Sequence, residues 1–336
     1  MSFDGGPDLF VEASQVVSAT VADQSPALGV ECTSLVHLYH LPDTDVVALR
    51  GVDLDIDPGE MVALLGPSGT GKSTLLKIMA GMLRPSAGQI LVGGRDVARM
   101  TAAELRRYRA VDVGIVLQDP RANLLPYATV RENIDFAGEG ARAQGGREVS
   151  VADLLLWTGL ERVEGKKTFA LSGGEQQLLA LAAGAAGGAR LLLIDEPTSQ
   201  LDVAGRDRVV GGLHDLHQQT GATLVMVTHD PQLAGSVPRT VTIRDGRVGA
   251  EGRHGSQYAV VGRDGTIQLP PEMLHHLPPD TLVRIIRQPG GVDLRVAGHD
   301  DDGTRAHEHA DEAADDHTGE PAADRDAEPR QTGGPW

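Results

Sequence analysis

The sequence has a single cysteine, Cys32, among 336 residues. An intramolecular disulfide is therefore impossible, and a reducing compartment is the expected environment. The sequence also has no apolar run close to the ~18 residues that a membrane-spanning helix needs, and its start lacks the basic and apolar pattern of a signal peptide. We therefore expect a cytoplasmic protein that works at a membrane only through another chain.

Positive charge is scarce as well, because 30 Lys and Arg stand against 47 Asp and Glu, a net charge of -17. This balance argues against a general affinity for nucleic acid or anionic lipid. Part of the acidic excess lies in residues 297–336, which we expect to be a disordered, solvated acidic tail, with weak metal binding by its histidines as the less favoured alternative. Residues 1–29 show no sustained hydrophobic period and are expected to form a disordered arm.

Glycine and hydroxyl residues, in contrast, gather in the stretch GPSGTGKST directly after the apolar run Met61–Leu65. The apolar run fits a buried strand, and the residues after the stretch fit a helix. This order predicts a phosphate-binding loop, because the glycines let backbone N–H groups face a phosphate and the helix start adds its positive end. Lys72 would contact the outer phosphates and Ser73 would ligate Mg²⁺. A glycine-rich turn with a chance lysine is the alternative. The expected nucleotide-binding residues here are Gly66, Pro67, Ser68, Gly69, Thr70, Gly71, Lys72, Ser73 and Thr74.

Two carboxylates, Asp195 and Glu196, follow another fully apolar run at 191–194. In open α/β sheets ligands bind beyond the carboxyl ends of the strands, so both side chains could reach the phosphate loop. Asp195 would ligate Mg²⁺, and Glu196 would activate a water for attack on the γ-phosphate. The alternative is a helix start with first-turn acids, because Pro197 and Thr198 follow.

Polar side chains at other strand ends could complete such a site. Gln118 could ligate Mg²⁺ or position the water, and His229 could donate a hydrogen bond to the γ-phosphate. Tyr39 lies on a strand edge, where its ring could stack on a purine, although a half-buried sheet aromatic is the commoner role. For Gln118 and His229, the commoner role is that of a polar residue at a strand end whose hydrogen bonds are made within the protein.

A second glycine turn, Ser172-Gly173-Gly174, opens an Ala/Leu-rich helix. Its backbone N–H groups and hydroxyl make it a second candidate anion site, with a simple glycine hinge as the alternative. One chain with two phosphate-binding loops and one nucleotide-sized site suggests that two copies sandwich two nucleotides.

These motifs match, in type, order and approximate spacing, those of the ATPase subunit of ABC transporters, which residues 30–252 resemble. The resemblance implies an α/β fold, a P-loop NTPase of ABC type with a helical signature subdomain at about residues 119–180. It also implies ATP and Mg²⁺ as ligands and places Asp202 in a loop that crosses the dimer interface. A head-to-tail homodimer, or a heterodimer with a related ATPase, would hydrolyse ATP and drive integral membrane permease subunits at the inner face of the cell membrane.

Within this family, short polar stretches are most similar to the lipoprotein-releasing and macrolide-exporter branch. That branch usually has arginines where Leu178 and Ala183 stand, which leaves coupling to the usual kind of partner open. A non-transport ABC ATPase in envelope or division control is one alternative. An ATP-gated regulator that acts through its C-terminal part is another.

Residues 257–296 predict a small, mostly-β C-terminal module with a strand hairpin around Gly290-Gly291. The pattern weakly resembles the AbrB-like swapped-hairpin family. Its arginines and acidic residues balance, so we do not expect it to bind nucleic acid. Forty residues are too few for a robust core, which predicts a dimerisation module. Elsewhere we expect a flexible polar loop at 138–148.

Overall fold

The structure, a computed structural model, describes residues 27–42, 44–199, 201–253, 256–261, 265–267, 269, 276–277, 281–289 and 291–296. The chain divides into two units, Met1–Leu274 and His275–Trp336, which we describe separately. Residues 1–26 of the expected arm and the expected acidic tail with its histidines lie outside the described residues.

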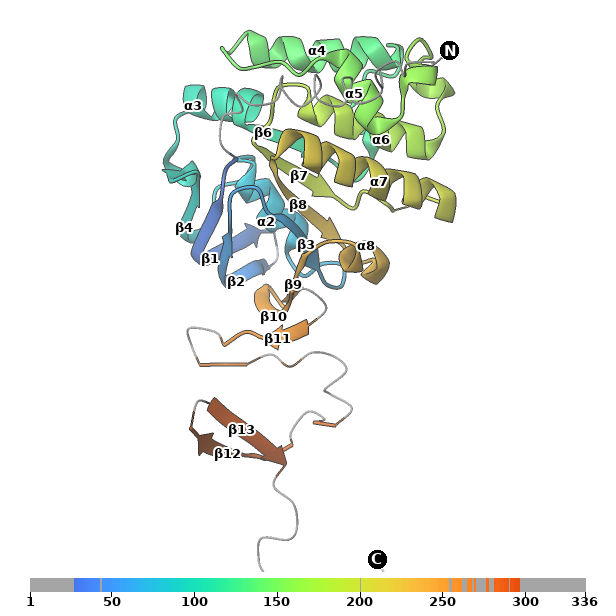
Figure 1. Ribbon diagram of the computed structural model, residues 1–336. Helices are drawn as coiled ribbons and strands as arrows, with labels where there is room; N and C mark the ends of the chain where they lie inside the picture. Colours follow the sequence, from blue (N-terminus) through green and yellow to red (C-terminus); the bar gives the residue numbers. More distant parts are fainter. Residues whose placement is uncertain are drawn as a thin grey trace, which may run out of the picture. The chain divides into compact units, whose positions relative to one another are not determined.

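A seven-stranded sheet forms the centre of the first unit (Figure 1). Five consecutive strands of this sheet are parallel to one another, and two further strands, which pair antiparallel, extend one of its edges. The strands β3, β7 and β8 are apolar almost throughout and buried, as expected for parallel strands covered on both faces. In sheet order the strands are β11 (Ser256–Ala259), β10 (Arg247–Arg253), β9 (Arg239–Arg244), β3 (Met61–Leu65), β8 (Thr223–Thr228), β7 (Leu191–Asp195) and β6 (Val113–Val116).

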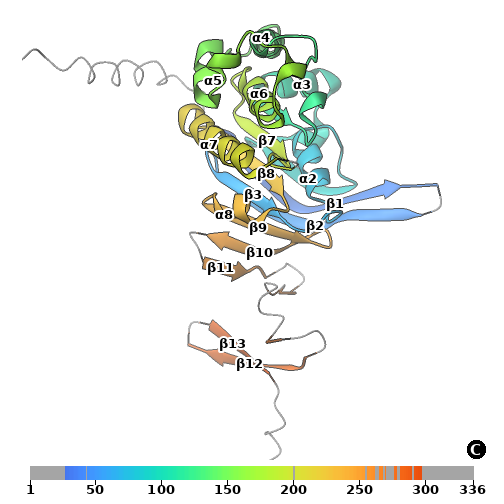
Figure 2. The same cartoon turned by 90° about the vertical axis from the view of Figure 1, so that its right-hand side faces the viewer.

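A second, four-stranded sheet lies on one side and encloses α2 (Lys72–Met79) between the two sheets. Val62 and Leu64 of β3 enter this core, together with Leu75 and Leu76 of the helix. Figure 2 shows β1 and β2 projecting beyond the rest of the unit as a long pair of strands. The strands of this sheet are β2 (Asp45–Ile56), β1 (Val30–His40), β4 (Ala87–Val92) and β5 (Arg95–Asp96).

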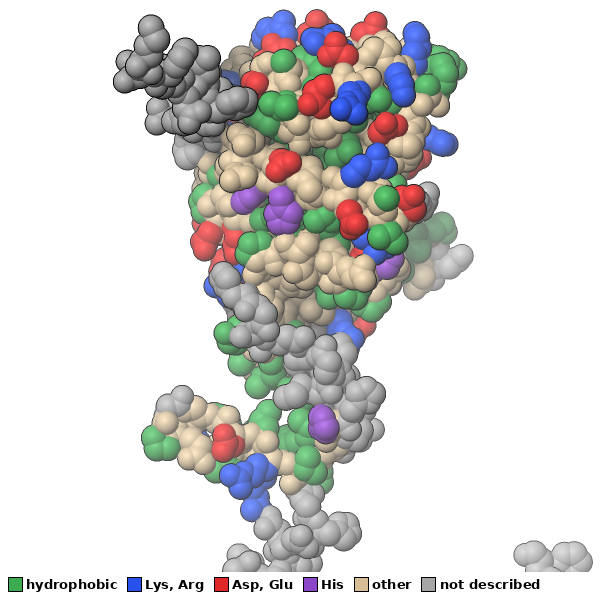
Figure 3. Space-filling view, turned by 45° about the vertical axis from the view of Figure 1, so that its right-hand side comes forward, with side chains coloured by type: hydrophobic (Ala, Val, Ile, Leu, Met, Phe, Trp, Pro, Cys, Tyr) green, Lys and Arg blue, Asp and Glu red, His purple; other side chains and the backbone are tan. Residues whose placement is uncertain are grey.

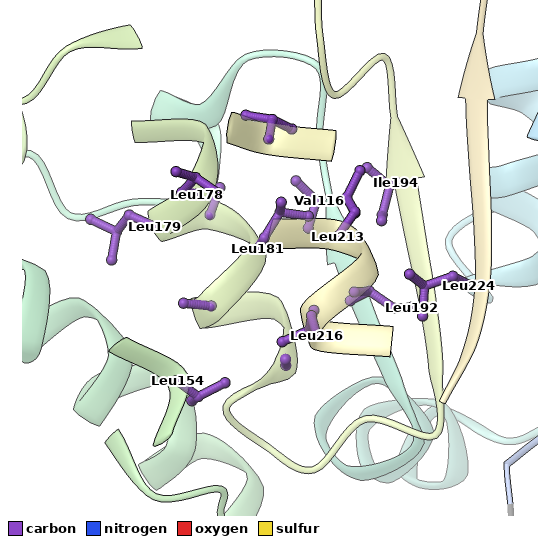
Figure 4. Packing of buried hydrophobic residues seen from close by; sticks show 14 of the residues in the cluster. Val116, Leu154, Leu178, Leu179, Leu181, Leu192, Ile194, Leu213, Leu216 and Leu224 are labelled. Carbon is purple, nitrogen blue, oxygen red and sulfur yellow. The ribbon is translucent and has the colours of Figure 1, made fainter. Parts of the chain in front are cut away.

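Helices cover the opposite face of the large sheet, where the alternate β3 residues Met61 and Ala63 point. Figure 4 shows leucines of α6 and α7 packed toward β7 and β8. Leu178 of α6 is 4% exposed, and a Cβ added at Gly212 of α7 would lie 2.6 Å from its Cδ2. Leu178 therefore packs in the interface between α6 and α7. The helices are α3 (Ala102–Arg107), α4 (Val130–Arg142), α5 (Val151–Thr158), α6 (Gly173–Ala185), α7 (Val203–Thr220) and α8 (Pro231–Gly235).

Short 3₁₀ turns and one π turn connect these elements. They are η1 (Val97–Arg99), η2 (Tyr108–Asp112, the π turn), η3 (Pro120–Ala122), η4 (Glu161–Val163) and η5 (Thr168–Ala170). Among the helices of the described residues, none combines the length and apolar character that crossing a membrane requires.

The expected loop at 138–148 is partly helical, because α4 continues to Arg142. Ala141 is buried, and the guanidinium of Arg142 lies 2.6 Å from a carboxylate oxygen of Glu148. A Cβ added at Gly138 would lie 2.8 Å from the same carboxylate. This sequence contains glycines and has a weak helix propensity, and its contacts with Glu148 stabilise it as a helix.

The expected 257–296 module is divided between the two units. Strand β11 pairs antiparallel with β10, so residues 256–259 extend the large sheet of the first unit. The second unit contains an antiparallel hairpin of β12 (Val283–Gln288) and β13 (Gly291–Val296). The α/β class and the small mostly-β C-terminal part are as predicted.

Candidate functional site

The loop between β3 and α2 is built around glycines that no other residue could replace without distortion. Gly71 caps α2 with φ 94°, and a Cβ there would lie 2.3 Å from the carbonyl oxygen of Ala48. A Cβ at Gly66 would lie 2.1 Å from the carbonyl oxygen of Ile243. These close approaches hold the loop backbone against two neighbouring strands, which fixes the direction of its N–H groups.

Lys72, the first residue of α2, folds back over the loop. Its Nζ donates hydrogen bonds to the carbonyl oxygens of Gly66 at 2.6 Å and Pro67 at 2.7 Å. Burial lowers the pKa of Lys72, and the nearby charges of Glu196 and Asp195 raise it. Both hydrogen bonds go to neutral carbonyls, so a phosphate would be a stronger partner for the ammonium.

Ser73 and Asp195 meet at the carboxyl end of β7. The Ser73 hydroxyl donates to Oδ1 of Asp195 at 3.1 Å, and Asp195 is 7% exposed. Burial raises the pKa of Asp195, while the Ser73 hydrogen bond and the lysines lower it. A hydroxyl and a buried carboxylate form the oxygen donor set that Mg²⁺ prefers, so these two residues fit that ion.

Glu196 and His229 form a second pair at the same edge, which the sequence did not indicate. Oε2 of Glu196 lies 2.9 Å from Nδ1 of His229, and the two side chains are 12% and 59% exposed, respectively. Glu196 has φ 50°, a left-handed backbone conformation that is uncommon outside glycine, and its N–H donates to Val227. Such a conformation next to a phosphate loop indicates a functional constraint.

The structure brings Tyr39 to the loop but does not join Gln118 to it. The Tyr39 hydroxyl lies 3.2 Å from that of Thr74, and its ring meets His37 edge to face at 4.7 Å. Gln118 is exposed two residues beyond β6. Among the described residues, no hydrogen bond links its side chain to Ser73 or Asp195.

A pocket of about 460 Å³ lies beside the phosphate loop and contains residues that the sequence analysis missed. Arg50 of β2 and Arg244 of β9 line it together with the loop residues Pro67 to Thr70. Nε of Arg244 is buried without a hydrogen-bond partner in the described structure. No local motif marks these arginines, because each comes from a separate strand.

The second glycine turn lies at the start of α6, next to the start of α7. Ser172 accepts a hydrogen bond from the Glu175 N–H, and the Glu175 carboxylate accepts one from the Ser172 N–H, which lowers the pKa of Glu175. Asp202 caps α7 by accepting from the Gly205 N–H at 2.8 Å. A Cβ added at Gly174 would lie 3.4 Å from the Cα of Gly205, so the two helix starts pack together.

This pair of helix starts is separate from the phosphate loop. Ser172, Gly173 and Asp202 are exposed, and no hydrogen bond between described residues joins them to residues 66–74. Gln200, between them, lies outside the described residues. Within one chain the first site therefore contains the loop, the two carboxylates and His229, and the helix starts at Ser172 and Asp202 form a separate group.

Comparison with known proteins gives one consistent family. A family profile described as "ABC transporter" matches residues 49–199, and one described as "AAA domain, putative AbiEii toxin, Type IV TA system" matches residues 164–235. The lipoprotein-releasing system ATP-binding protein LolD of Geobacter metallireducens is 40% identical over 66% of this chain and 98% of its own length. The macrolide export ATP-binding/permease protein MacB of Syntrophobacter fumaroxidans is 38% identical over 66% of this chain.

The match to that macrolide exporter spans only 31% of the exporter's length, about a third. Among solved structures, the dimeric post-hydrolysis state of the ATP-binding cassette MJ0796 bound to ADP and Pi superposes with a TM-score of 0.60 and 30% identity. That likeness covers 67% of this chain and 98% of MJ0796. The family resemblance and the branch predicted from the motifs are confirmed.

Proposed function

Because the chain belongs to the ABC transporter family of ATP-binding subunits, we propose that it hydrolyses ATP in a head-to-tail homodimer to drive separate permease subunits in the membrane. One observation carries this proposal. The carboxyl edge of β3, β8 and β7 brings together Lys72, the Ser73–Asp195 pair and the Glu196–His229 pair. A cation, an ion-binding oxygen pair and a base with its hydrogen-bonding partner are what phosphoryl transfer to water requires.

Binding of ATP would depend on the phosphate loop and the pocket beside it. Backbone N–H groups of residues 66–74 would hold the phosphates, and Lys72 would exchange its two carbonyl partners for phosphate oxygens. Tyr39, which lies beside the start of α2, would stack on the adenine. Arg50 and Arg244 add positive charge along the pocket wall.

Ser73 and Asp195 would hold Mg²⁺, with Gln118 as a further oxygen ligand. When bound, the ion neutralises charge on the phosphates. The hydrogen bond between Ser73 and Asp195 already brings the two oxygens within 3.1 Å of each other.

Glu196 would take the proton from the attacking water. Its carboxylate is largely buried beside His229, which holds it in place through Nδ1. The other ring nitrogen of His229, which is mostly exposed, can donate to the γ-phosphate when both ring nitrogens carry a proton, because the Nδ1–H already donates to Glu196. The pair thus couples the position of the base to the presence of the phosphate.

The exposed residues Ser172, Gly173 and Asp202, with the buried Gly174 behind them, would close the site of a second copy. A hydroxyl and the N-terminus of α6 suit a phosphate, and within one chain they are not joined to the loop. Each ATP would then lie between the loop of one copy and the signature of the other.

A docking face for the permease lies among exposed aromatic residues of the helical region. Tyr127 and Phe169 are 79% and 66% exposed, and the Lys167 ammonium donates to the Tyr127 carbonyl at 2.9 Å. Exposed aromatic side chains on a firmly held loop are typical of binding surfaces. Docking there would place this chain at the inner face of the cell membrane.

Complementation between two inactive variants tests the head-to-tail arrangement. Ser172→Arg and Lys72→Ala should each abolish hydrolysis, the first while retaining one ATP per monomer and the second by weakening ATP binding. In an equal mixture, half of the dimers contain one intact composite site, so roughly a quarter of wild-type ATPase activity should return. Ser150→Arg, at another exposed helix start, is the matched control and should hydrolyse normally. A mixture as inactive as its parents would contradict independent composite sites.

A further inference from the structure

The hairpin of β12 and β13 carries all but one of its apolar strand residues on one face; the exception is Ile286. Val283 lies opposite Val296, Ile285 opposite Leu294, and Arg287 opposite Val292. Because side chains alternate along a strand, these pairs share one face. We call its apolar members the apolar strip: Val283, Ile285, Val292, Leu294 and Val296. The other face presents Arg284 opposite Arg295 and Ile286 opposite Asp293.

The apolar strip is uncovered in the described structure. Ile285 is 67% exposed, Val292 59% and Val296 52%, and Figure 3 shows hydrophobic side chains at the surface of this region beside charged ones. A strand pair with one apolar and one polar face is the pattern of a sheet whose apolar face is buried. A two-stranded hairpin alone is only marginally stable in water, so the strip needs a cover.

We propose that the apolar strip packs face to face against the same strip of a second copy of this chain. The small area of the strip is the reason for proposing this partner. Each strand has six residues and is therefore about 20 Å long. Two such hairpins cover much less than the roughly 1,200 Å² of a stable interface between freely diffusing proteins. So small a strip suits a partner that another contact already holds nearby, and a second copy in the ATP-dependent dimer meets that condition. The inference thus rests on the proposed function.

Charge determines the orientation of the pairing. Arg287 lies at the turn end of the strip-bearing face, opposite Val292. Parallel stacking would bring the two Arg287 side chains together, whereas antiparallel stacking separates them by about 13 Å, four residues of strand. In the antiparallel arrangement, the aliphatic stem of Arg287 covers the other copy's Val283–Val296 end. The central Ile285–Leu294 pair then lies over its own counterpart on the two-fold axis.

The paired hairpins therefore link two copies of the chain through a contact that does not involve the nucleotide. Residues 260–282 connect β11 to the hairpin. Once ATP has joined two copies, pairing of the hairpins raises the effective concentration of each cassette around the other. The two copies then separate more slowly when the ATP sites open.

Cysteine cross-linking in the full chain tests the contact directly. The native Cys32 is buried and its pKa is raised to about 12, so it does not compete for the oxidant. Leu294→Cys places a thiol on the two-fold axis, and the matched Arg295→Cys places one on the opposite face. Both are made with Glu196→Gln, incubated with ATP and oxidised with copper phenanthroline. We expect Leu294→Cys to form a disulfide-linked dimer at least 10-fold faster than Arg295→Cys.

Equal linking rates in an ATP-induced dimer overturn this inference and leave the proposed function intact. If ATP induces no dimer by light scattering, the proposed function fails and the inference fails with it. A second pair of variants excludes simple misfolding, because Ile285 and Ile286 are the same side chain on opposite faces. Ile285→Ser should raise the dimer Kd by about 10-fold and Ile286→Ser by less than twofold, with ATP binding by the monomer unchanged. Equal weakening by both also overturns the contact.

Discussion

Replacing Glu196 with glutamine tests the chemistry of the site with the smallest change in shape. The amide keeps the size of the side chain, and its oxygen can still accept the hydrogen bond that now joins Glu196 to His229 at 2.9 Å. It cannot take a proton from water. Because Glu196 makes no hydrogen bond to the phosphate loop within the described structure, ATP affinity should be retained.

The expected magnitude follows from the role of a general base. Losing one typically slows a reaction by roughly 10²-fold to 10⁴-fold. A loss of 10²-fold corresponds to about 2.7 kcal/mol in the activation free energy. The Glu196 side chain is only 12% exposed, so we expect at least this loss, since bulk water has little access to replace the missing carboxylate.

The assay is phosphate release at saturating ATP and Mg²⁺, accompanied by nucleotide titration and by light scattering for the dimer. Glu196→Gln should bind ATP normally, hydrolyse it at least 10²-fold more slowly and accumulate as an ATP-bound dimer. Glu139→Gln, at an exposed position of α4, is the matched control. Adding His229→Ala to Glu196→Gln should slow the reaction by a smaller factor than His229→Ala slows the wild type, because part of the histidine's effect acts through the carboxylate. Wild-type turnover by Glu196→Gln would refute the assignment of the base.

Three further perturbations follow from buried groups. Asp195→Asn should raise the Mg²⁺ concentration for half-maximal ATPase activity by about 10-fold or more, while nucleotide affinity without Mg²⁺ changes little; an unchanged Mg²⁺ dependence would contradict its assignment as a ligand. Burial, followed by the charges of Asp55 and Asp53, raises the pKa of Cys32 to about 12. The free energy of unfolding that this shift contributes should therefore be fully present below about pH 9. It should fall as the pH rises toward 12, by at most about 1.4 kcal/mol per pH unit. Cys32→Ala should lack this component of the alkaline loss in urea unfolding. Asn133 is 4% exposed, and its side chain forms hydrogen bonds with the Leu125 backbone, the Thr129 carbonyl and the Thr168 hydroxyl. Asn133→Ala should therefore lower the free energy of unfolding by about 3 kcal/mol in urea titration. A loss below about 1 kcal/mol would refute the role of these hydrogen bonds.

The sequence alone determined the features that depend on neighbouring residues. The order of strand, glycine loop, lysine and helix around Lys72 is local, and the structure places the loop between β3 and α2 as predicted. The helix at Val203–Thr220 likewise has local start and stop signals, because Asp202 caps its start and Gly221, in the left-handed conformation, follows its end. The buried strand before Asp195 was equally clear, since apolar side chains fill nearly all of it.

Only the tertiary structure decided which distant residues meet. The bond between Glu196 and His229 depends on β7 and β8 being neighbours, and the pocket arginines Arg50 and Arg244 come from strands in different sheets. Strand β11 lies beside β10 because backbone pairing extends the sheet edge, which side-chain periodicity cannot specify. The Glu196–His229 contact and the pocket of Arg50 and Arg244 join chain segments far apart in sequence, so their free energy belongs to the assembled sheets rather than to any local motif.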